Sequence, residues 1–287
     1  GRGPRRWGRL RLTPGFIIIG AMKSATSTVT AYFENHPEVF MIPGFEPNFF
    51  CDSDIHAKGT GWYDSHFAAN TAGLLAGEGS NYYAARDMFP DTAERMAAYN
   101  PELKLIYMVR HPLERIVSSW IQYRSDNGDA IPPTIDKAVR QNPAMFVGQS
   151  LYWYNLQPFF ERFPKKNIFI GFMEDLSRDA DAFFADLCAF LGVPPANVAR
   201  AHQNPSAGKK VPGKMYSAIN RVPFSGLAKR VLPDRLKGAV KDTVLSTSAR
   251  NVAGFSDELR NALVEQIAPD AEALLAYCGK PKDFWTL

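Results

Sequence analysis

The segment from Phe16 to Thr28 joins an aliphatic run to a short polar loop that carries one lysine. Phe16 to Ile19 has the continuous apolar composition of a buried parallel strand, and a helical pattern begins after the loop. Free N–H groups and the positive end of the helix dipole attract anions at such a junction. The loop therefore predicts a phosphate or sulfate site. Its polar contacts would be Lys23, Ser24, Thr26, Ser27 and Thr28.

Two other interpretations of this loop stay open. One is an ordinary strand-to-helix junction, in which the hydroxyl groups only cap the helix. The other is a nucleotide kinase of the P-loop type, but its Walker A pattern, Gly-x-x-x-x-Gly-Lys-Ser/Thr, does not fit, because Met22 precedes Lys23 where that pattern has glycine. Demonstrated binding of ATP and Mg²⁺ would favour the kinase.

The elements that position this loop alternate along the chain. Strand-like runs recur at Phe16–Ile19, 73–78, Lys104–Val109 and 167–172, and helical patterns fill most of the intervals between them. Such alternation predicts an α/β fold with a central parallel sheet flanked by helices. We expect one domain, residues 13–287, after a basic and disordered segment, residues 1–12.

Helix boundaries are marked at several positions. Pro112 suits the first turn of a helix whose apolar residues recur at spacings of three and four up to position 124. Near the C-terminus, Ser256 should cap a helix, Pro269 should break or kink it, and Gly279 should end it. The stretch 204–242, rich in Lys, Arg, Gly and Pro, is expected to be a long surface segment.

Composition narrows the class of protein. The chain has 287 residues, 46% of them hydrophobic, and a net charge of +4. No apolar run approaches the roughly 18 residues that cross a bilayer, so we expect no membrane span. Three well-separated cysteines favour a reducing compartment, and we expect a cytoplasmic protein. The histidines and cysteines lack metal-ligand spacing, and no nucleic-acid module is recognisable, so neither a metal nor a nucleic acid is expected.

The loop resembles the 5′-phosphosulfate loop of the sulfotransferases that use 3′-phosphoadenosine 5′-phosphosulfate (PAPS), Gly-x-x-Lys-x-Gly-Thr-Thr. The resemblance implies a P-loop-like sulfotransferase fold and extends from Phe16 to Trp285. It also implies that the loop from Lys23 to Thr28 binds PAPS and, after transfer, the product adenosine 3′,5′-bisphosphate (PAP). Ala25 stands where the family usually has glycine, which matters if the backbone there requires a positive φ.

A second motif strengthens the resemblance. Arg110, His111 and Pro112 follow a strand, and Ser118 lies eight residues after the arginine, which is similar to the family's 3′-phosphate motif. At the carboxyl end of a strand, Arg110 would present a forked donor to a phosphate, and Ser118 would add a hydroxyl. Taken singly, these residues could equally be a structural ion pair and a helix-surface serine.

The segment Pro43–Phe50 is similar to the Lys-Glu-Pro-x-Phe-Phe segment of the heparan-sulfate-like and bacterial branches, where the glutamate is the general base. The resemblance makes Glu46 the base. Enclosure by Phe45, Phe49 and Phe50 would raise the pKa of this carboxyl by desolvation. The alternative is an exposed loop glutamate.

Two lysines of the family's acceptor side are missing, because Phe45 and Gly79 occupy their positions. Their absence argues against a strongly anionic polysaccharide as acceptor. Lys209 and Lys210 lie where the family places a basic loop over the 3′-phosphate, although they could also be solvated surface lysines.

The sequence thus predicts an enzyme that moves a sulfuryl group from PAPS to a hydroxyl, in preference to an amine, of a small-molecule, lipid-like or carbohydrate acceptor. In this scheme Glu46 takes the acceptor proton, and Lys23 stabilises the leaving phosphate. A non-catalytic nucleotide-binding protein is the alternative from another class, since a fold does not fix a function.

Overall fold

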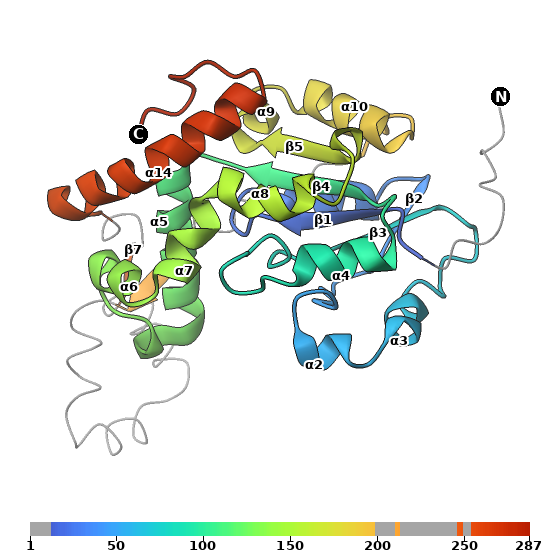
Figure 1. Cartoon of the computed structure of the whole chain (residues 1–287), viewed down its shortest axis with the longest axis horizontal. Helices are drawn as coiled ribbons and strands as arrows, with labels where there is room; N and C mark the ends of the chain where they lie inside the picture. The colour runs from blue at the N-terminus through green and yellow to red at the C-terminus, as the bar shows by residue number, and fades with distance from the viewer. Residues whose placement is uncertain (1–12, 199–209, 213–245, 249–253) are drawn as a thin grey trace.

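The computed structural model of the chain describes residues 13–198, 210–212, 246–248 and 254–287. Its centre is a parallel sheet in the order β2-β3-β1-β4-β5 (Figure 1). The strands are β1 (Phe16–Gly20), β2 (Val39–Met41), β3 (Leu75–Gly79), β4 (Lys104–Val109) and β5 (Ile168–Phe172). The predicted α/β fold with a central parallel sheet is confirmed. The basic segment 1–12, Lys209 and nearly all of the stretch 204–242 lie outside the described residues.

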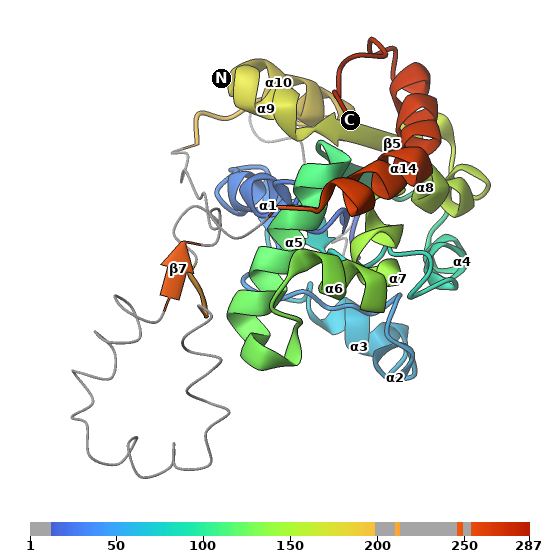
Figure 2. The same cartoon turned by 90° about the vertical axis from the view of Figure 1, so that its left-hand side faces the viewer.

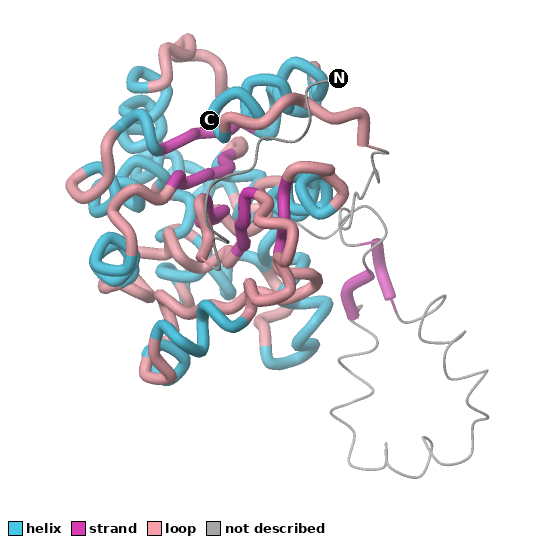
Figure 3. Tube along the Cα trace, turned by 90° about the vertical axis from the view of Figure 1, so that its right-hand side faces the viewer, coloured by secondary structure: helices cyan, strands magenta, loops and turns pink. Residues whose placement is uncertain are grey.

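Helices cover both faces of the sheet because alternate residues of β1 are buried on opposite sides (Figures 2 and 3). Phe16 and Ile18 pack with α1 (Thr26–Glu34) and α10 (Ala180–Leu191). Ile17 and Ile19 face the other core, to which further helices contribute. These are α4 (Thr92–Tyr99), α5 (Pro112–Asn127), α8 (Tyr152–Phe160) and α14 (Asp257–Tyr277).

Shorter elements fill the connections. They are α2 (Ser53–His56), α3 (Thr60–Ser65), η1 (Gly128–Ala130), α6 (Ile135–Gln141), α7 (Pro143–Phe146), η2 (Gly148–Ser150), η3 (Lys165–Asn167) and α9 (Met173–Arg178). A separate antiparallel pair joins β6 (Lys210–Pro212) to β7 (Ser246–Ser248).

Most of the predicted helix boundaries are confirmed. Pro112 is the first residue of α5, the Ser256 side chain accepts a hydrogen bond from Leu259 N, and Gly279 follows α14 with a φ of 67°. The break expected at Pro269 is wrong, since α14 continues through it. Proline removes only one helix donor, and the apolar residues of α14 on both sides of Pro269 are buried in one core.

The sheet places the candidate site residues at one edge. All five strands are parallel, so the loops after β1, β2, β3 and β4 leave the same carboxyl edge. Helix α5 starts at this edge, which Figure 2 views nearly head-on. Lys23, Glu46, Asn81 and Arg110 each belong to one of these four loops.

Candidate functional site

The loop after β1 is held against the loop after β3. Gly20 has a φ of 130°, and a Cβ placed on it would lie only 2.9 Å from the carbonyl oxygen of Asn81. The amide of Ser80 also donates to the carbonyl of Ile18, at 3.1 Å. Because the two backbones touch, only glycine fits at position 20. The main chain therefore holds the loop of Lys23 against the loop of Asn81.

The Lys23 loop turns sharply into α1. Lys23 and Ala25 have φ angles of 71° and 64°, and α1 begins at Thr26. Ser24 is fully buried beside the hydroxyl of Tyr152, whereas Ser27 is exposed at the start of the helix and Thr28 is half-buried. Ser27 is therefore the hydroxyl of this loop that is most open to a ligand.

Ala25→Gly is expected to stabilise the protein by about 0.5 to 1 kcal/mol, because glycine removes the strain of a positive φ but adds freedom to the unfolded chain. Urea unfolding of the purified variant measures the change. Ala31→Gly, inside α1, is the matched control and should instead destabilise by about 1 kcal/mol. Equal destabilisation by the two substitutions would show that the strain at Ala25 is negligible.

The Lys23 side chain points toward α5. Its ammonium donates to Gln122 Oε1 at 3.0 Å, and its own carbonyl oxygen accepts from Arg110 Nη1 at 3.4 Å. The loop after β1 is thus connected to the loop after β4 by Arg110. The two anion-binding motifs predicted from the sequence meet in the structure.

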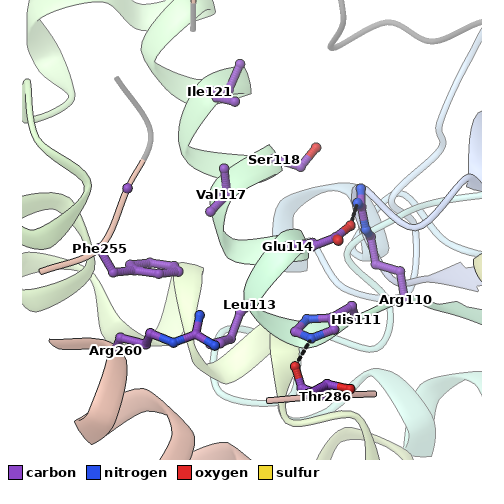
Figure 4. A pocket seen from close by; sticks show the side chains of 11 residues that line it. Arg110, His111, Leu113, Glu114, Val117, Ser118, Ile121, Phe255, Arg260 and Thr286 are labelled. Carbon is purple, nitrogen blue, oxygen red and sulfur yellow. Dashed lines mark hydrogen bonds and ion pairs between the residues drawn. The ribbon is translucent and has the colours of Figure 1, made fainter. Parts of the chain in front are cut away.

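Arg110 and Ser118 line one pocket of about 580 Å³. Ser118 is almost completely buried at its rim, and Arg110 forms an ion pair with Glu114 one turn into α5 (Figure 4). The ion pair agrees with the structural role that was left open for Arg110. The buried Nε of Arg110 nevertheless lacks a partner, and Arg260 of α14 adds a second guanidinium to the lining.

Glu174 fixes the backbone at the entrance of this pocket. Its Oε1 accepts from His111 N at 2.7 Å and from the indole of Trp285 at 3.0 Å. His111 in turn contacts the carbonyl of Thr286 through Nε2, at 2.9 Å (Figure 4). The C-terminal segment therefore helps to hold the turn that carries Arg110.

Glu46 lies after β2 and is held by Asn81. Its Oε2 accepts from Asn81 N at 3.2 Å and its Oε1 from Asn81 Nδ2 at 2.5 Å. Burial beside this loop raises the pKa of the Glu46 carboxyl, although the two hydrogen bonds oppose the rise. The pKa direction expected from the sequence is confirmed.

The predicted enclosure of Glu46 by phenylalanines is wrong. Phe49 and Phe50 are fully buried and pack on Tyr63, while Glu46 is exposed by residue area. Phe45 is 47% exposed, with its ring 5.2 Å from that of His66. Two adjacent rings were drawn into the core because each fills more apolar space there than it could beside a carboxylate.

The two other basic candidates are only partly placed. Lys209 lies outside the described residues, and Lys210 begins β6, whose backbone runs beside α5. At Gly79, where the family has a lysine, a Cβ would lie 3.3 Å from Thr30 Oγ1 and 3.4 Å from Ile18 Cβ. A side chain at this position would require Thr30 to shift by a few tenths of an ångström.

Asn81, Gln122, Arg260 and Glu174 were not identified from the sequence as parts of the site. Asn81 belongs to a segment that resembles the family's acceptor side, but nothing in its spacing points to Glu46. Gln122 lies four residues after Ser118, one turn farther along α5, and this helical spacing was the available signal.

Comparison with known proteins assigns the chain to a family. Residues 14–210 match the family model described as the sulfotransferase domain. The chain therefore belongs to the sulfotransferase family, in agreement with its parallel sheet and with the Lys23 loop at the carboxyl edge.

Curated relatives share parts of the chain. The membrane-associated sulfotransferase kil1 of Dictyostelium discoideum is 34% identical over 116 residues, which is 39% of this chain and 24% of that protein. Heparan sulfate glucosamine 3-O-sulfotransferase 3B1 of Mus musculus is 29% identical over 188 residues, 63% of this chain and 46% of that protein. This chain thus spans less than half the length of these two relatives.

A solved sulfotransferase from Alicyclobacillus acidocaldarius has the same fold. It superposes with a TM-score of 0.63 at 20% identity, and the match covers 94% of this chain and 97% of that chain.

Within the described residues, no helix is long and apolar enough to span a bilayer, and no three His, Cys, Asp or Glu side chains gather as a metal site.

Proposed function

We propose that this protein transfers a sulfuryl group from PAPS to an acceptor hydroxyl, with an amine as the less favoured acceptor. The observation that carries the proposal is the contact between Asn81 and Gly20. It joins the loop of Lys23 to the residue that holds Glu46. A cation for a leaving phosphate and a carboxylate for an acceptor proton are thereby fixed at one edge of the sheet.

One unpaired buried group supports a nucleotide at this edge. The Nε of Arg110 is buried and lacks a partner, and the N-terminus of α1 directs N–H groups into the loop after β1. The 5′-phosphate and sulfate groups would be held by Lys23, Ser24, Thr26, Ser27, Thr28 and the backbone at Ala25. The 3′-phosphate would be held by Arg110 and Ser118, with Arg260 as an addition. Lys209 and Lys210 remain predicted contacts on this side.

Glu46 and Lys23 carry opposite charges and have different roles in the proposed reaction. The Glu46 carboxylate accepts the proton of the acceptor hydroxyl, and a raised pKa makes it a stronger base. The Lys23 ammonium neutralises charge at the phosphate end of the loop, together with backbone N–H groups of α1. PAPS, when bound, supplies a sulfuryl group attached to a phosphate that can leave. The Lys23 ammonium and the N-terminus of α1 take the place that Mg²⁺ has in kinases.

A carbohydrate acceptor is supported by a relative, because the mouse protein is named as a heparan sulfate glucosamine sulfotransferase. The phenylalanine at position 45 and the crowded Gly79 remove two positive charges, which favours a less anionic acceptor than heparan sulfate. A cytoplasmic location, a lipid-like acceptor and the absence of a nucleic-acid partner remain predictions from the sequence.

The decisive experiment incubates the purified protein with radiolabelled PAPS and a cell extract and identifies labelled products by mass spectrometry. A product that forms only with active protein supports transfer. Binding of PAPS without any labelled product would leave a non-catalytic nucleotide-binding protein as the better explanation.

PAP should raise the melting temperature more than ATP with Mg²⁺ does at equal concentration, because Arg110 and Ser118 offer a second site for a 3′-phosphate. Differential scanning fluorimetry measures both shifts. Ser118→Ala should reduce the shift with PAP and leave that with adenosine 5′-phosphate unchanged. The reverse ligand order would favour the kinase.

A further inference from the structure

A buried carboxyl group lies under the segment that carries Glu46. Glu78, in β3, is fully buried. The hydroxyl of Tyr63 donates to its Oε1 at 3.2 Å, and the hydroxyl of Ser80 donates to its Oε2 at 3.0 Å. A buried carboxyl normally has such partners. The hydroxyl of Tyr83 also lies beside Glu78 and Ser80. Tyr63 and Ser80 come from different elements, and only Ser80 connects Glu78 to the segment of Glu46.

Ser80 carries the connection onward to the Glu46 segment. A hydroxyl has one proton, and in this structure that proton goes to Glu78, so the oxygen lone pairs of Ser80 can accept. They accept the backbone N–H of Asn48 at 3.0 Å. Asn48 has a φ of 51°, and its side-chain amide donates to the carbonyl of Glu46 at 3.3 Å. The turn from Glu46 to Asn48 is therefore attached to β3 through one hydroxyl.

We propose that Ser80, oriented by Glu78, is a positioning residue that sets where the Glu46 carboxylate lies. Two adjacent residues hold the two ends of the turn. Ser80 holds the backbone at Asn48, and Asn81 holds the carboxylate of Glu46. If Ser80 released the backbone, the turn would keep the bonds of Asn81 to Glu46 and those of Cys51 N and Asp52 N to the Asn48 carbonyl, but it would lose its backbone attachment to the residue after β3. The catalytic meaning of this role rests on the proposed function, whereas the positioning itself does not.

Several titratable groups surround the Glu78 carboxyl. Burial raises the pKa of Glu78 to about 7. The titratable groups that face it are Tyr63 from α3, Tyr83 from the loop after β3, and Cys51 and Glu46 from the segment after β2. Both states of the carboxyl can bond to Ser80, because a protonated Glu78 can donate to the hydroxyl that otherwise donates to it.

Tyr63 provides a matched control because it bonds to the same carboxyl but has no hydrogen bond to the turn. Its ring stacks on Phe49 at 4.7 Å and is fully buried. Tyr63→Phe removes one hydrogen bond to Glu78 and keeps the ring. Ser80→Ala removes one hydrogen bond to Glu78 and also the attachment of Asn48. A difference between the two variants therefore measures the effect of the hydrogen bond from Asn48 N to Ser80.

The first test follows the titration of the Glu46 carboxyl by NMR with isotope-labelled glutamate, assigned with Glu46→Gln. In Ser80→Ala, the pKa of Glu46 should fall toward its ordinary value, because the released turn is better hydrated. In Tyr63→Phe it should stay at the wild-type value. An unchanged titration in Ser80→Ala, or equal changes in both variants, would overturn the proposal. This test needs no acceptor and no turnover.

The second test measures transfer to the acceptor that the labelled extract identifies. Ser80→Ala should lower kcat by about 10- to 100-fold, since a misplaced base costs about that much, while the Kd for PAP changes less than about twofold. Ser80→Cys, which keeps a weak donor and acceptor, should recover part of the rate. Lost PAP binding in Ser80→Ala would contradict positioning. If wild type transfers nothing, the proposed function fails, and the NMR titration still decides the role of Ser80.

Discussion

Lys23→Ala is expected to lower kcat for sulfuryl transfer by about 100- to 1000-fold, the usual cost of removing one charged or hydrogen-bonding group that meets developing negative charge. Lys23 belongs to a loop that is closed by Arg110 and by the start of α1, and no other basic residue occurs in that loop. Initial rates with saturating PAPS measure the loss.

Lys23→Met separates charge from bulk, because methionine keeps an unbranched chain of similar length. Lys23→Met should lower kcat nearly as much as Lys23→Ala does. Gln122→Ala removes the hydrogen bond between the lysine and Gln122 while leaving the charge of the lysine, and it should retain most of the rate. Near wild-type turnover in Lys23→Met would rule out the charge as the important property and leave Lys23 a structural role in the loop.

Glu46→Gln should abolish most turnover, by about 100- to 10,000-fold, because the amide cannot accept the acceptor proton. Calorimetry should find PAP binding unchanged, since the residues proposed to hold the nucleotide follow β1 and β4 rather than β2. Glu94→Gln, on α4, is a matched control at an unrelated position and should be silent.

The pH dependence gives the same substitution a second measurement. Glu46 must be ionised to act as a base, and burial raises its pKa, so the wild-type kcat should rise as pH increases through that raised value and then level off. The residual rate of Glu46→Gln should lack this inflection. If Glu46→Gln lost PAP binding instead, the residue would be structural and another base would be required.

The fold was accessible from the sequence because its central strands are fully buried. The runs Phe16–Ile19 and Leu105–Val109 have no exposed face, as expected for parallel strands with helices on both sides. The edge strand β2 was missed because Val39–Met41 is only three residues long. The break at Pro269 was wrong because one lost hydrogen bond costs less than the buried stripe of α14 contributes.

The site was only partly accessible for a different reason. The local pattern pointed to Lys23, and the resemblance to the family's 3′-phosphate motif pointed to Arg110 and Ser118. The partners that hold them are distant, as with Lys23 and Gln122 or Glu46 and Asn81. Only the order of strands brings these pairs together, and a single sequence does not state that order.

The close approach of Gly20 to Asn81 bears on how members of this family could differ in acceptor. The separation between the lysine loop and the asparagine that holds the carboxylate is set by main chain against main chain, with no side chain between them. Side chains outside this contact, such as the half-exposed Phe45, can therefore be exchanged during evolution without changing that separation. In the proposed reaction, the side chains that determine acceptor preference can therefore change while the distance between Glu46 and the PAPS loop stays the same.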